Sequence, residues 1–308
     1  MSVNIFAHVG IALYYQSWLK NKKTGVSKSM IIDFHAHIFP EKIRNHREDF
    51  FSSEPAFKLL YESPRALLVG ADDVIKVMDA ENVDISVVFG FPWTNSETYR
   101  LNNDYIIEAV QKYPDRFVGF ACFDLNCPDA AKETERCLDA GLVGIGELAF
   151  YQSGIDDEAL KKMEPVMALC AKNDLPVLIH TNEPVGHIYP GKTPVTMLQI
   201  YNLAEKFPEN KIVLAHWGGG IFFFNLLKKA AKGVLKNIWY DTAASPYLYD
   251  AEIFKAAVEL AGVDKIVFGS DYPLLKPSRY YAEVEKSGVN KNAADKILGG
   301  NAAELLKL

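Results

Sequence analysis

Two histidines near the start of the chain have the spacing of a metal site. His35 and His37 follow the apolar run 31–34, which predicts a short buried strand. Side chains alternate along a strand, so both imidazoles point the same way, about 6.6 Å apart. Two neutral imidazoles at a strand end suit a divalent transition metal. An isolated His-x-His pair also occurs as hydrogen-bonded residues in a turn, so the rest of the chain must supply further ligands.

Other residues with metal-binding or acid–base chemistry end later apolar runs: Glu147, His180, His216, Asp241 and Asp271. Three imidazoles and a carboxylate can hold one Zn²⁺ and leave a position for water, whose pKa falls towards 7. Asp271 could accept the proton of that water. His216 could polarise a substrate carbonyl or relay a proton, and Glu147 could orient a ligand or bridge to a second metal. Each residue taken singly could equally be an interior hydrogen-bonded or ion-paired group.

The elements that must position these residues alternate between strand and helix. Eight strands are predicted, at 31–34, 83–89, 117–122, 143–148, 176–180, 211–216, 238–241 and 265–270. Helices are predicted between them and after the last, among them 73–82, 105–113, 128–140, 157–173, 222–232 and 251–261. Near-continuously apolar strands are typical of a parallel sheet covered on both faces. We therefore expect an α/β protein with a single (β/α)₈ TIM barrel over residues 30–308, whose strand ends carry the chemistry. A doubly wound sheet is the alternative.

Residues 1–29 lie outside this predicted barrel. The segment 6–19 is apolar and aromatic, but no basic region precedes it and no convincing cleavage site follows. We interpret the segment as an N-terminal extension, with a surface helix or a weak membrane or partner contact left open. No apolar run in the chain reaches the roughly 18 residues of a membrane-spanning helix.

Composition narrows the class of protein. The 308 residues are 49% hydrophobic and 23% charged, which is ordinary for a globular protein. A net charge of −6 argues against nonspecific nucleic-acid binding, so we expect a small-molecule substrate. Four cysteines without paired metal spacing predict the reduced thiols of a cytoplasmic protein. The sequence leaves the oligomeric state open, a homodimer included.

Cationic and aromatic residues near the strand ends are candidates for binding a substrate. Arg44 and Arg47 lie in a long connection after the first strand, and connections of that length are usually functional. They could bind a substrate carboxylate, or be solvated surface residues. Trp93, Tyr151 and Trp217 follow later strands, and we expect them to line the pocket or else to cap the barrel.

Several motifs, in this order, resemble the amidohydrolase superfamily. They are HAH at 35–37, LIHTNEP at 178–184, LAHWGG at 214–219, GSDYP at 269–273 and ILGGNAAELL at 297–306. They are most similar to its amidohydrolase-related branch, which includes aminocarboxymuconate-semialdehyde decarboxylase, and the resemblance covers residues 30–308. It implies that His35, His37, His180 and Asp271 are metal ligands and that His216 is the catalytic histidine. GIGELAF around Glu147 is also similar to TatD-type hydrolases, in which a glutamate there joins two metals.

The expected function is a metal-dependent hydrolase of a small, carboxylated C–O or C–N substrate, using one zinc ion. Two zinc ions, with Glu147 as a ligand of the second, are the alternative. The rival enzymatic hypothesis is a nonoxidative decarboxylase of an aromatic or enoic acid on the same metal site. A metal-binding barrel without catalysis is a third hypothesis, and it is disfavoured because both His216 and Asp271 are present. A TatD-like nuclease is disfavoured by the acidic charge balance.

Overall fold

The computed structural model describes residues 29–229 and 231–308. The extension expected at residues 1–29 lies outside the described residues, except for its last one. Among the described helices, none is long and apolar enough to cross a membrane. All four cysteines are buried and free of disulfides.

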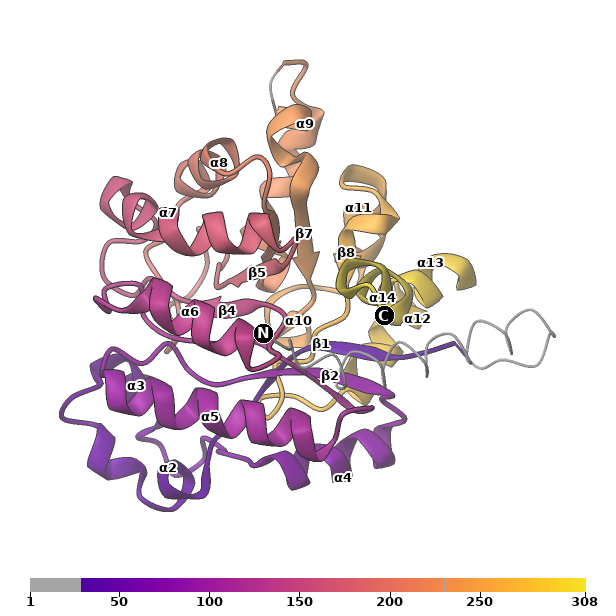
Figure 1. Cartoon of the computed structure of the whole chain (residues 1–308). Helices are drawn as coiled ribbons and strands as arrows, with labels where there is room; N and C mark the ends of the chain where they lie inside the picture. The colour runs from indigo at the N-terminus through magenta and orange to yellow at the C-terminus, as the bar shows by residue number, and fades with distance from the viewer. Residues whose placement is uncertain (1–28, 230) are drawn as a thin grey trace.

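Eight parallel strands form the centre of the molecule (Figure 1). One sheet has the order β1-β2-β3 and the other the order β4-β5-β6-β7-β8. The α/β class with parallel strands is therefore confirmed, although the strands are hydrogen-bonded as two sheets where the sequence predicts one. Their bounds are Ile32–His37, Ile85–Phe89 and Phe117–Gly119 for β1 to β3, and Ile145–Leu148, Pro176–Ile179, Lys211–Leu214, Ile238–Asp241 and Ile266–Val267 for β4 to β8.

Isolated bridges join the two sheets at both of their edges. Ala121, just after β3, pairs with Ile145 of β4, and Ala36 of β1 pairs with Tyr272, shortly after β8. The amide of His37 also donates to the Tyr272 carbonyl at 2.8 Å. The end of β1 is thereby joined to the segment after β8, and the start of β4 to the segment after β3.

The register of β1 is irregular at the point where its histidines begin. The pairing with β2 shifts between Asp33 and Ala36. Beyond this shift the rings of His35 and His37 both pack on Phe89, at centroid distances of 5.0 and 4.8 Å. The two imidazoles therefore share one side, as predicted. Such irregularities commonly re-aim a side chain next to a functional site.

Helices surround the strands (Figure 1). Asn95 caps α5 by accepting from the amides of Glu97 and Thr98, so this helix starts well before the predicted residue 105. Asp156 caps α7 by accepting from the amide of Ala159. The bounds are Ala71–Glu81 for α4, Ser96–Lys112 for α5, Ala130–Asp139 for α6, Asp157–Lys172 for α7, Met197–Lys206 for α8, Glu252–Leu260 for α11, Ser278–Lys286 for α12, Lys291–Asp295 for α13 and Asn301–Leu306 for α14.

The long connection after β1 is folded rather than irregular. It contains α2 (Glu41–Asn45), the 3₁₀ turn η1 (Arg47–Phe50) and α3 (Pro55–Tyr61). An aromatic cluster packs this connection on the loop after β2, with the ring of Phe57 4.4 Å from that of Trp93. Aromatic pairs at such distances add to the stability gained from burial alone.

The segment after β6 differs from its predicted helix at 222–232. It forms the 3₁₀ segment η2 (His216–Leu226), followed by the short helix α9 (Ala231–Val234). The backbone is left-handed from His216 (φ 55°) through Gly220 (φ 91°). A Cβ on Gly219 would lie 2.3 Å from the Asn182 carbonyl oxygen, so glycine is required for this close approach.

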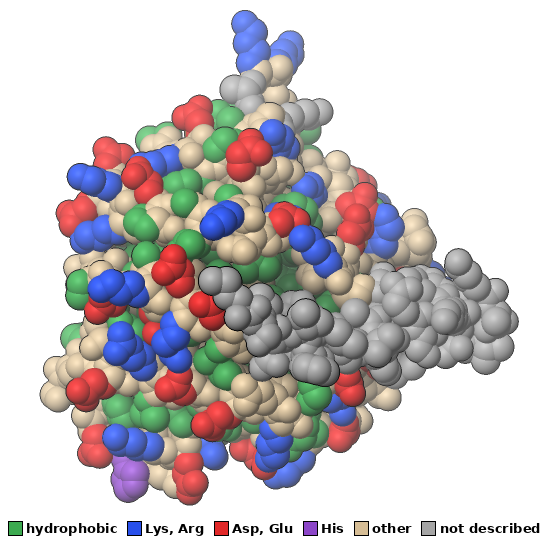
Figure 2. Space-filling model, viewed as in Figure 1, with side chains coloured by type: hydrophobic (Ala, Val, Ile, Leu, Met, Phe, Trp, Pro, Cys, Tyr) green, Lys and Arg blue, Asp and Glu red, His purple; other side chains and the backbone are tan. Residues whose placement is uncertain are grey.

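Charged side chains of both signs are mixed over the face shown in Figure 2. Within the described part of this face, blue and red groups alternate without forming a patch of one sign.

Candidate metal and active site

Six side chains from five strand ends meet in one cluster, which we call the histidine–carboxylate cluster. His35 and His37 come from β1 and Glu147 from β4, and the others lie within four residues of the ends of β5, β6 and β8: His180, His216 and Asp271. The four histidines and Glu147 each expose less than a tenth of their surface. The sequence prediction that these residues lie together is consistent with this geometry.

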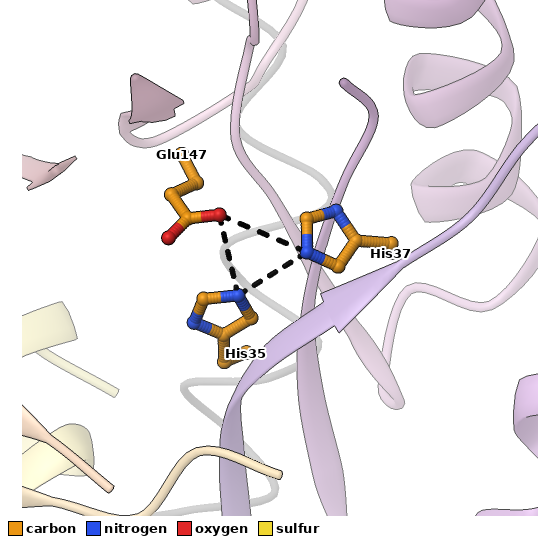
Figure 3. A group of neighbouring side chains, drawn as sticks. All are labelled: His35, His37 and Glu147. Atoms are coloured by element: carbon orange, nitrogen blue, oxygen red, sulfur yellow. Dashed lines mark hydrogen bonds and ion pairs between the residues drawn. The ribbon is translucent and has the colours of Figure 1, made fainter. Parts of the chain in front are cut away.

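One half of the cluster is formed by the two histidines of β1 and two carboxylates; Figure 3 shows the histidines with one of these, Glu147. The Nε2 atoms of His35 and His37 are 3.2 Å apart. Glu147 Oε2 lies 3.6 and 3.8 Å from these two nitrogens. Asp271 Oδ1 lies 3.5 and 3.4 Å from them. Four potential ligand atoms therefore surround one small space.

The other half of the cluster uses the second oxygen of Glu147. Oε1 lies 2.9 Å from His180 Nδ1 and 3.5 Å from His216 Nε2. These two ring nitrogens are 3.2 Å apart. The structure thus groups His180 with His216, whereas the sequence resemblance placed it with His35 and His37. Glu147 belongs to both ligand groups.

Each imidazole is held by its outer nitrogen, the one that faces away from the cluster. An acceptor-only oxygen faces this nitrogen, so the nitrogen carries a proton, and in the neutral imidazole the inner nitrogen presents a lone pair to the cluster. The bonds join His35 Nδ1 to Asp241 Oδ2 (2.8 Å), and His37 Nδ1 to the Gly90 carbonyl, His180 Nε2 to the Gly191 carbonyl and His216 Nδ1 to the Ala243 carbonyl (2.9 Å each).

This donor set fits a divalent cation. Two neutral imidazole lone pairs 3.2 Å apart, as at His35 and His37, repel each other unless a proton or a metal ion is shared between them. Imidazole nitrogens with carboxylate oxygens are ligands of Zn²⁺, Mn²⁺ and Fe²⁺. The convergence of four inner nitrogens on two carboxylates supports a divalent metal site.

The charges within the cluster are strongly coupled. Burial alone would raise the pKa of Glu147, but the charges of His180 and His35 hold it well below its usual value. Burial would likewise raise the pKa of Asp271, and His35 and His37 lower it to about 2. Burial lowers the pKa of His216, but a hydrogen bond to Glu147 and the charge of Asp271 outweigh this and raise it to about 9. The carboxylates therefore stay ionised next to any cation.

Asp241 is a further member of the site. It is fully buried at the end of β7 and accepts hydrogen bonds from His35 and from the backbone amide of His216. Its place at the end of a predicted strand was the only sequence signal for it. Backbone acceptors such as Gly90 and Gly191 carry no such signal.

The predicted substrate-binding residues fall into two groups. Tyr151 lies at the cluster, with its ring stacked 6.3 Å from that of His180. Trp93 and Trp217 are 0% exposed and donate to Asn102 and Ser245, so their side chains offer no surface to a substrate in this structure.

The two predicted arginines have partners within the polypeptide. Arg44 donates to the Phe39 carbonyl, and its guanidinium lies 3.8 Å from the Asp73 carboxylate. Arg47 donates to two backbone carbonyls, those of Tyr61 and Ala66. These contacts stabilise the connection after β1, because each guanidinium group bonds to backbone carbonyls or to a carboxylate at other positions in the chain.

A cavity of about 420 Å³ is lined in part by residues 148–151, which directly follow Glu147 in the chain. Phe123, Leu148 and Tyr151 contribute to its wall. Tyr151 therefore has contacts both with this cavity and with the ring of His180.

The family's sequence profile, described as amidohydrolase, matches residues 32–308. The chain belongs to the amidohydrolase family. Over 303 residues it is 26% identical to the 2-amino-3-carboxymuconate-6-semialdehyde decarboxylase of Dictyostelium discoideum, covering 80% of this chain and 82% of that protein.

Two solved decarboxylase structures share the fold of this amidohydrolase family member. The 5-carboxyvanillate decarboxylase of Sphingomonas paucimobilis superposes with a TM-score of 0.72 at 18% identity, covering 91% of this chain and all of that one. A dihydroxybenzoic acid decarboxylase from Polaromonas sp. JS666, solved with bound manganese and the inhibitor 2-nitroresorcinol, gives 0.66 at 22% identity, covering 91% and 98%.

These relatives overturn the expectation of a hydrolase. The similar proteins are named as decarboxylases, which agrees with the alternative hypothesis instead. The physical reason for the error is that a divalent cation withdraws electrons from a bound carboxylate as well as from a water molecule. The ligands alone therefore do not select between the two reactions.

Proposed function

We propose that this protein is a metal-dependent nonoxidative decarboxylase of a small aromatic or enoic carboxylic acid. The observation that carries the proposal is the match to a decarboxylase along 80% of the chain. The cluster of four imidazoles and two carboxylates supports it, because a cation-binding site is where such a substrate would be held. Residues 30–308 would form one closed (β/α)₈ barrel, with the bridges at Ala121 and Ala36 as its two seams, and residues 1–29 an extension outside it.

His35, His37 and Asp271 would hold the cation, with Glu147 as the carboxylate shared with His180. Zinc suits the nitrogen-rich set, and manganese is bound in the Polaromonas structure. When bound, the cation would withdraw electrons from substrate oxygens and so stabilise negative charge as it develops. We propose one tightly held ion, because His216 is then left free for chemistry.

In the reaction, the bond between the substrate carbon and its carboxylate carbon breaks and CO₂ leaves. The electron pair stays on the substrate carbon, which must take up a proton. His216 is the proposed donor of this proton from Nε2, since its Nδ1 is engaged by the Ala243 carbonyl. Tyr151 would support a flat substrate next to His180, because its ring already lies nearly parallel to that imidazole.

The test separates decarboxylation from hydrolysis. Metal-loaded protein is incubated in ²H₂O with aromatic acids such as 2,6-dihydroxybenzoate and 5-carboxyvanillate, and CO₂ release is measured with deuterium incorporation at the vacated carbon. We expect one deuterium per CO₂ and loss of both signals after chelation. The proposal would be refuted if lactones or amides were hydrolysed, with ¹⁸O from labelled water in the acid product, and no carboxylic acid released CO₂.

A further inference from the structure

Asp241 occupies a position between the two halves of the cluster. Its Oδ2 accepts from His35 Nδ1 at 2.8 Å. Its Oδ1 accepts from the backbone amides of His216 at 3.0 Å and Ala243 at 2.9 Å. All three partners are donors and the side chain is 0% exposed, so each carboxylate oxygen acts as an acceptor of buried hydrogen bonds.

The same carboxylate holds the turn that presents His216. The backbone of His216 is left-handed, with φ 55°, a conformation that non-glycine residues rarely adopt. Asp241 fixes the amide of this residue and the amide of Ala243, while the Ala243 carbonyl fixes its ring. A single buried side chain therefore supports one imidazole from each half of the cluster.

We propose that Asp241 is a positioning residue that selects the tautomer of His35, an inference that rests on the metal site of the proposed function. With Oδ2 as acceptor, the imidazole proton stays on Nδ1. The lone pair of Nε2 then faces Glu147 and Asp271, the carboxylates that would hold the cation together with it. Carboxylates that accept from a ligand imidazole in this way commonly change metal affinity by about 10–100-fold when they are replaced.

Replacement of Asp241 by asparagine reverses this selection. The new side-chain amide cannot direct its NH₂ group at the backbone amides of His216 and Ala243, because these are donors. Its oxygen must take their place as acceptor, and its NH₂ group then donates to His35 Nδ1. The proton of His35 moves to Nε2, so the lone pair points away from the cluster.

The experiment compares wild type and Asp241→Asn by zinc affinity and by NMR. Zinc affinity is measured by competition with a chromophoric chelator, and we expect it to fall about 10–100-fold in the variant. In zinc-loaded protein with ¹⁵N-labelled histidine, the wild type should show a proton on Nδ1 of His35, assigned by its loss in His35→Ala. In Asp241→Asn this proton should appear on Nε2 instead.

A matched control is Glu54→Gln. Glu54 is also a buried carboxylate, 1% exposed, that accepts only from donors of Thr94 and Asn95. This substitution should disturb a buried site to a similar extent while leaving zinc affinity and the His35 resonance unchanged.

Three results would overturn the inference. They are a wild-type His35 protonated on Nε2 when zinc is bound, unchanged zinc affinity in Asp241→Asn, and an equal loss of zinc affinity in Glu54→Gln. The first does not depend on the Asp241 variant, so it decides the question even if Asp241→Asn does not fold. None of these measurements uses a substrate, so a failure of the decarboxylase proposal would be seen separately, as absent CO₂ release.

Discussion

The substitution Gly90→Ala should disturb the histidine–carboxylate cluster through the backbone carbonyl that orients His37. The Gly90 carbonyl accepts from His37 Nδ1 at 2.9 Å and so fixes that ring. A Cβ at this position would lie 2.4 Å from Asn102 Oδ1 and 2.5 Å from its Cγ. Such distances require either the Asn102 side chain or the Gly90 backbone to move.

The buried amide of Asn102 has little freedom to move. It accepts from the Trp93 indole at 2.9 Å and donates to the Ile38 carbonyl at 3.1 Å, and both bonds are buried. Displacement would leave two buried groups unpaired at about 1–3 kcal/mol each, so we expect a loss of about 2–6 kcal/mol in the free energy of unfolding. If the backbone moves instead, the Gly90 carbonyl leaves His37, and zinc affinity should fall about 10–100-fold.

Urea unfolding of metal-free protein measures the first effect, and chelator competition measures the second. Gly300→Ala is the matched control, because its Cβ would meet nothing closer than 3.5 Å and its backbone is helical, with φ −57°. We expect that control to be unchanged or stabilised by about 0.5–1 kcal/mol. The reasoning is refuted if Gly90→Ala unfolds within about 1 kcal/mol of wild type and binds zinc equally well.

Three further predictions follow from the structure. His216→Ala should lower turnover about 10²–10⁴-fold while zinc stays bound to the group of His35 and His37; unchanged turnover would remove its chemical role. Turnover should be maximal at one equivalent of zinc and fall as a second binds; a maximum at two equivalents would favour a two-metal enzyme. Burial would raise the pKa of Glu133, but hydrogen bonds from Arg136 and Asn103 lower it. The ionised Glu133 therefore stabilises the folded protein at pH values above its unfolded pKa of about 4.3. This contribution is lost as the pH falls through the pKa of the folded state. Glu133→Gln should therefore lower stability at pH 7, with the difference from wild type shrinking in acid; a difference independent of pH would contradict this.

The sequence predicted which residues meet, because strand ends can be read from it. Six of the eight predicted strands end at or next to a histidine or carboxylate, and the carboxyl ends of parallel strands meet at the same edge of a sheet. His180 and Asp271 are far apart in the chain, yet His180 follows β5 directly and Asp271 lies four residues after the end of β8. The identities of the cluster residues were therefore accessible without knowledge of loop conformation.

The surroundings of the cluster could not be predicted in the same way. Trp93 and Arg47 have residue types that suit substrate binding, but the folded connection after β1 uses them for packing and for holding backbone carbonyls. The helix expected at 222–232 is not continuous: η2 ends at Leu226 and α9 begins at Ala231, and a left-handed turn at 216–220 precedes them, with Gly219 against the Asn182 carbonyl. Hydrophobic pattern carries information about burial, whereas side-chain direction and turn geometry depend on contacts distant in sequence.

The anchoring of the imidazoles links the number of metal ions to the reaction. Because an oxygen acceptor holds the outer nitrogen of His216, only Nε2 can act in the cluster. That nitrogen can bind a second cation together with His180 and Glu147, or it can deliver a proton to a substrate carbon, but it cannot do both at once. Decarboxylation requires that proton, whereas hydrolysis by a two-metal site does not. Because His216 is bonded to the Ala243 carbonyl, the reaction of this amidohydrolase family member depends on whether a second cation occupies the group of Glu147, His180 and His216.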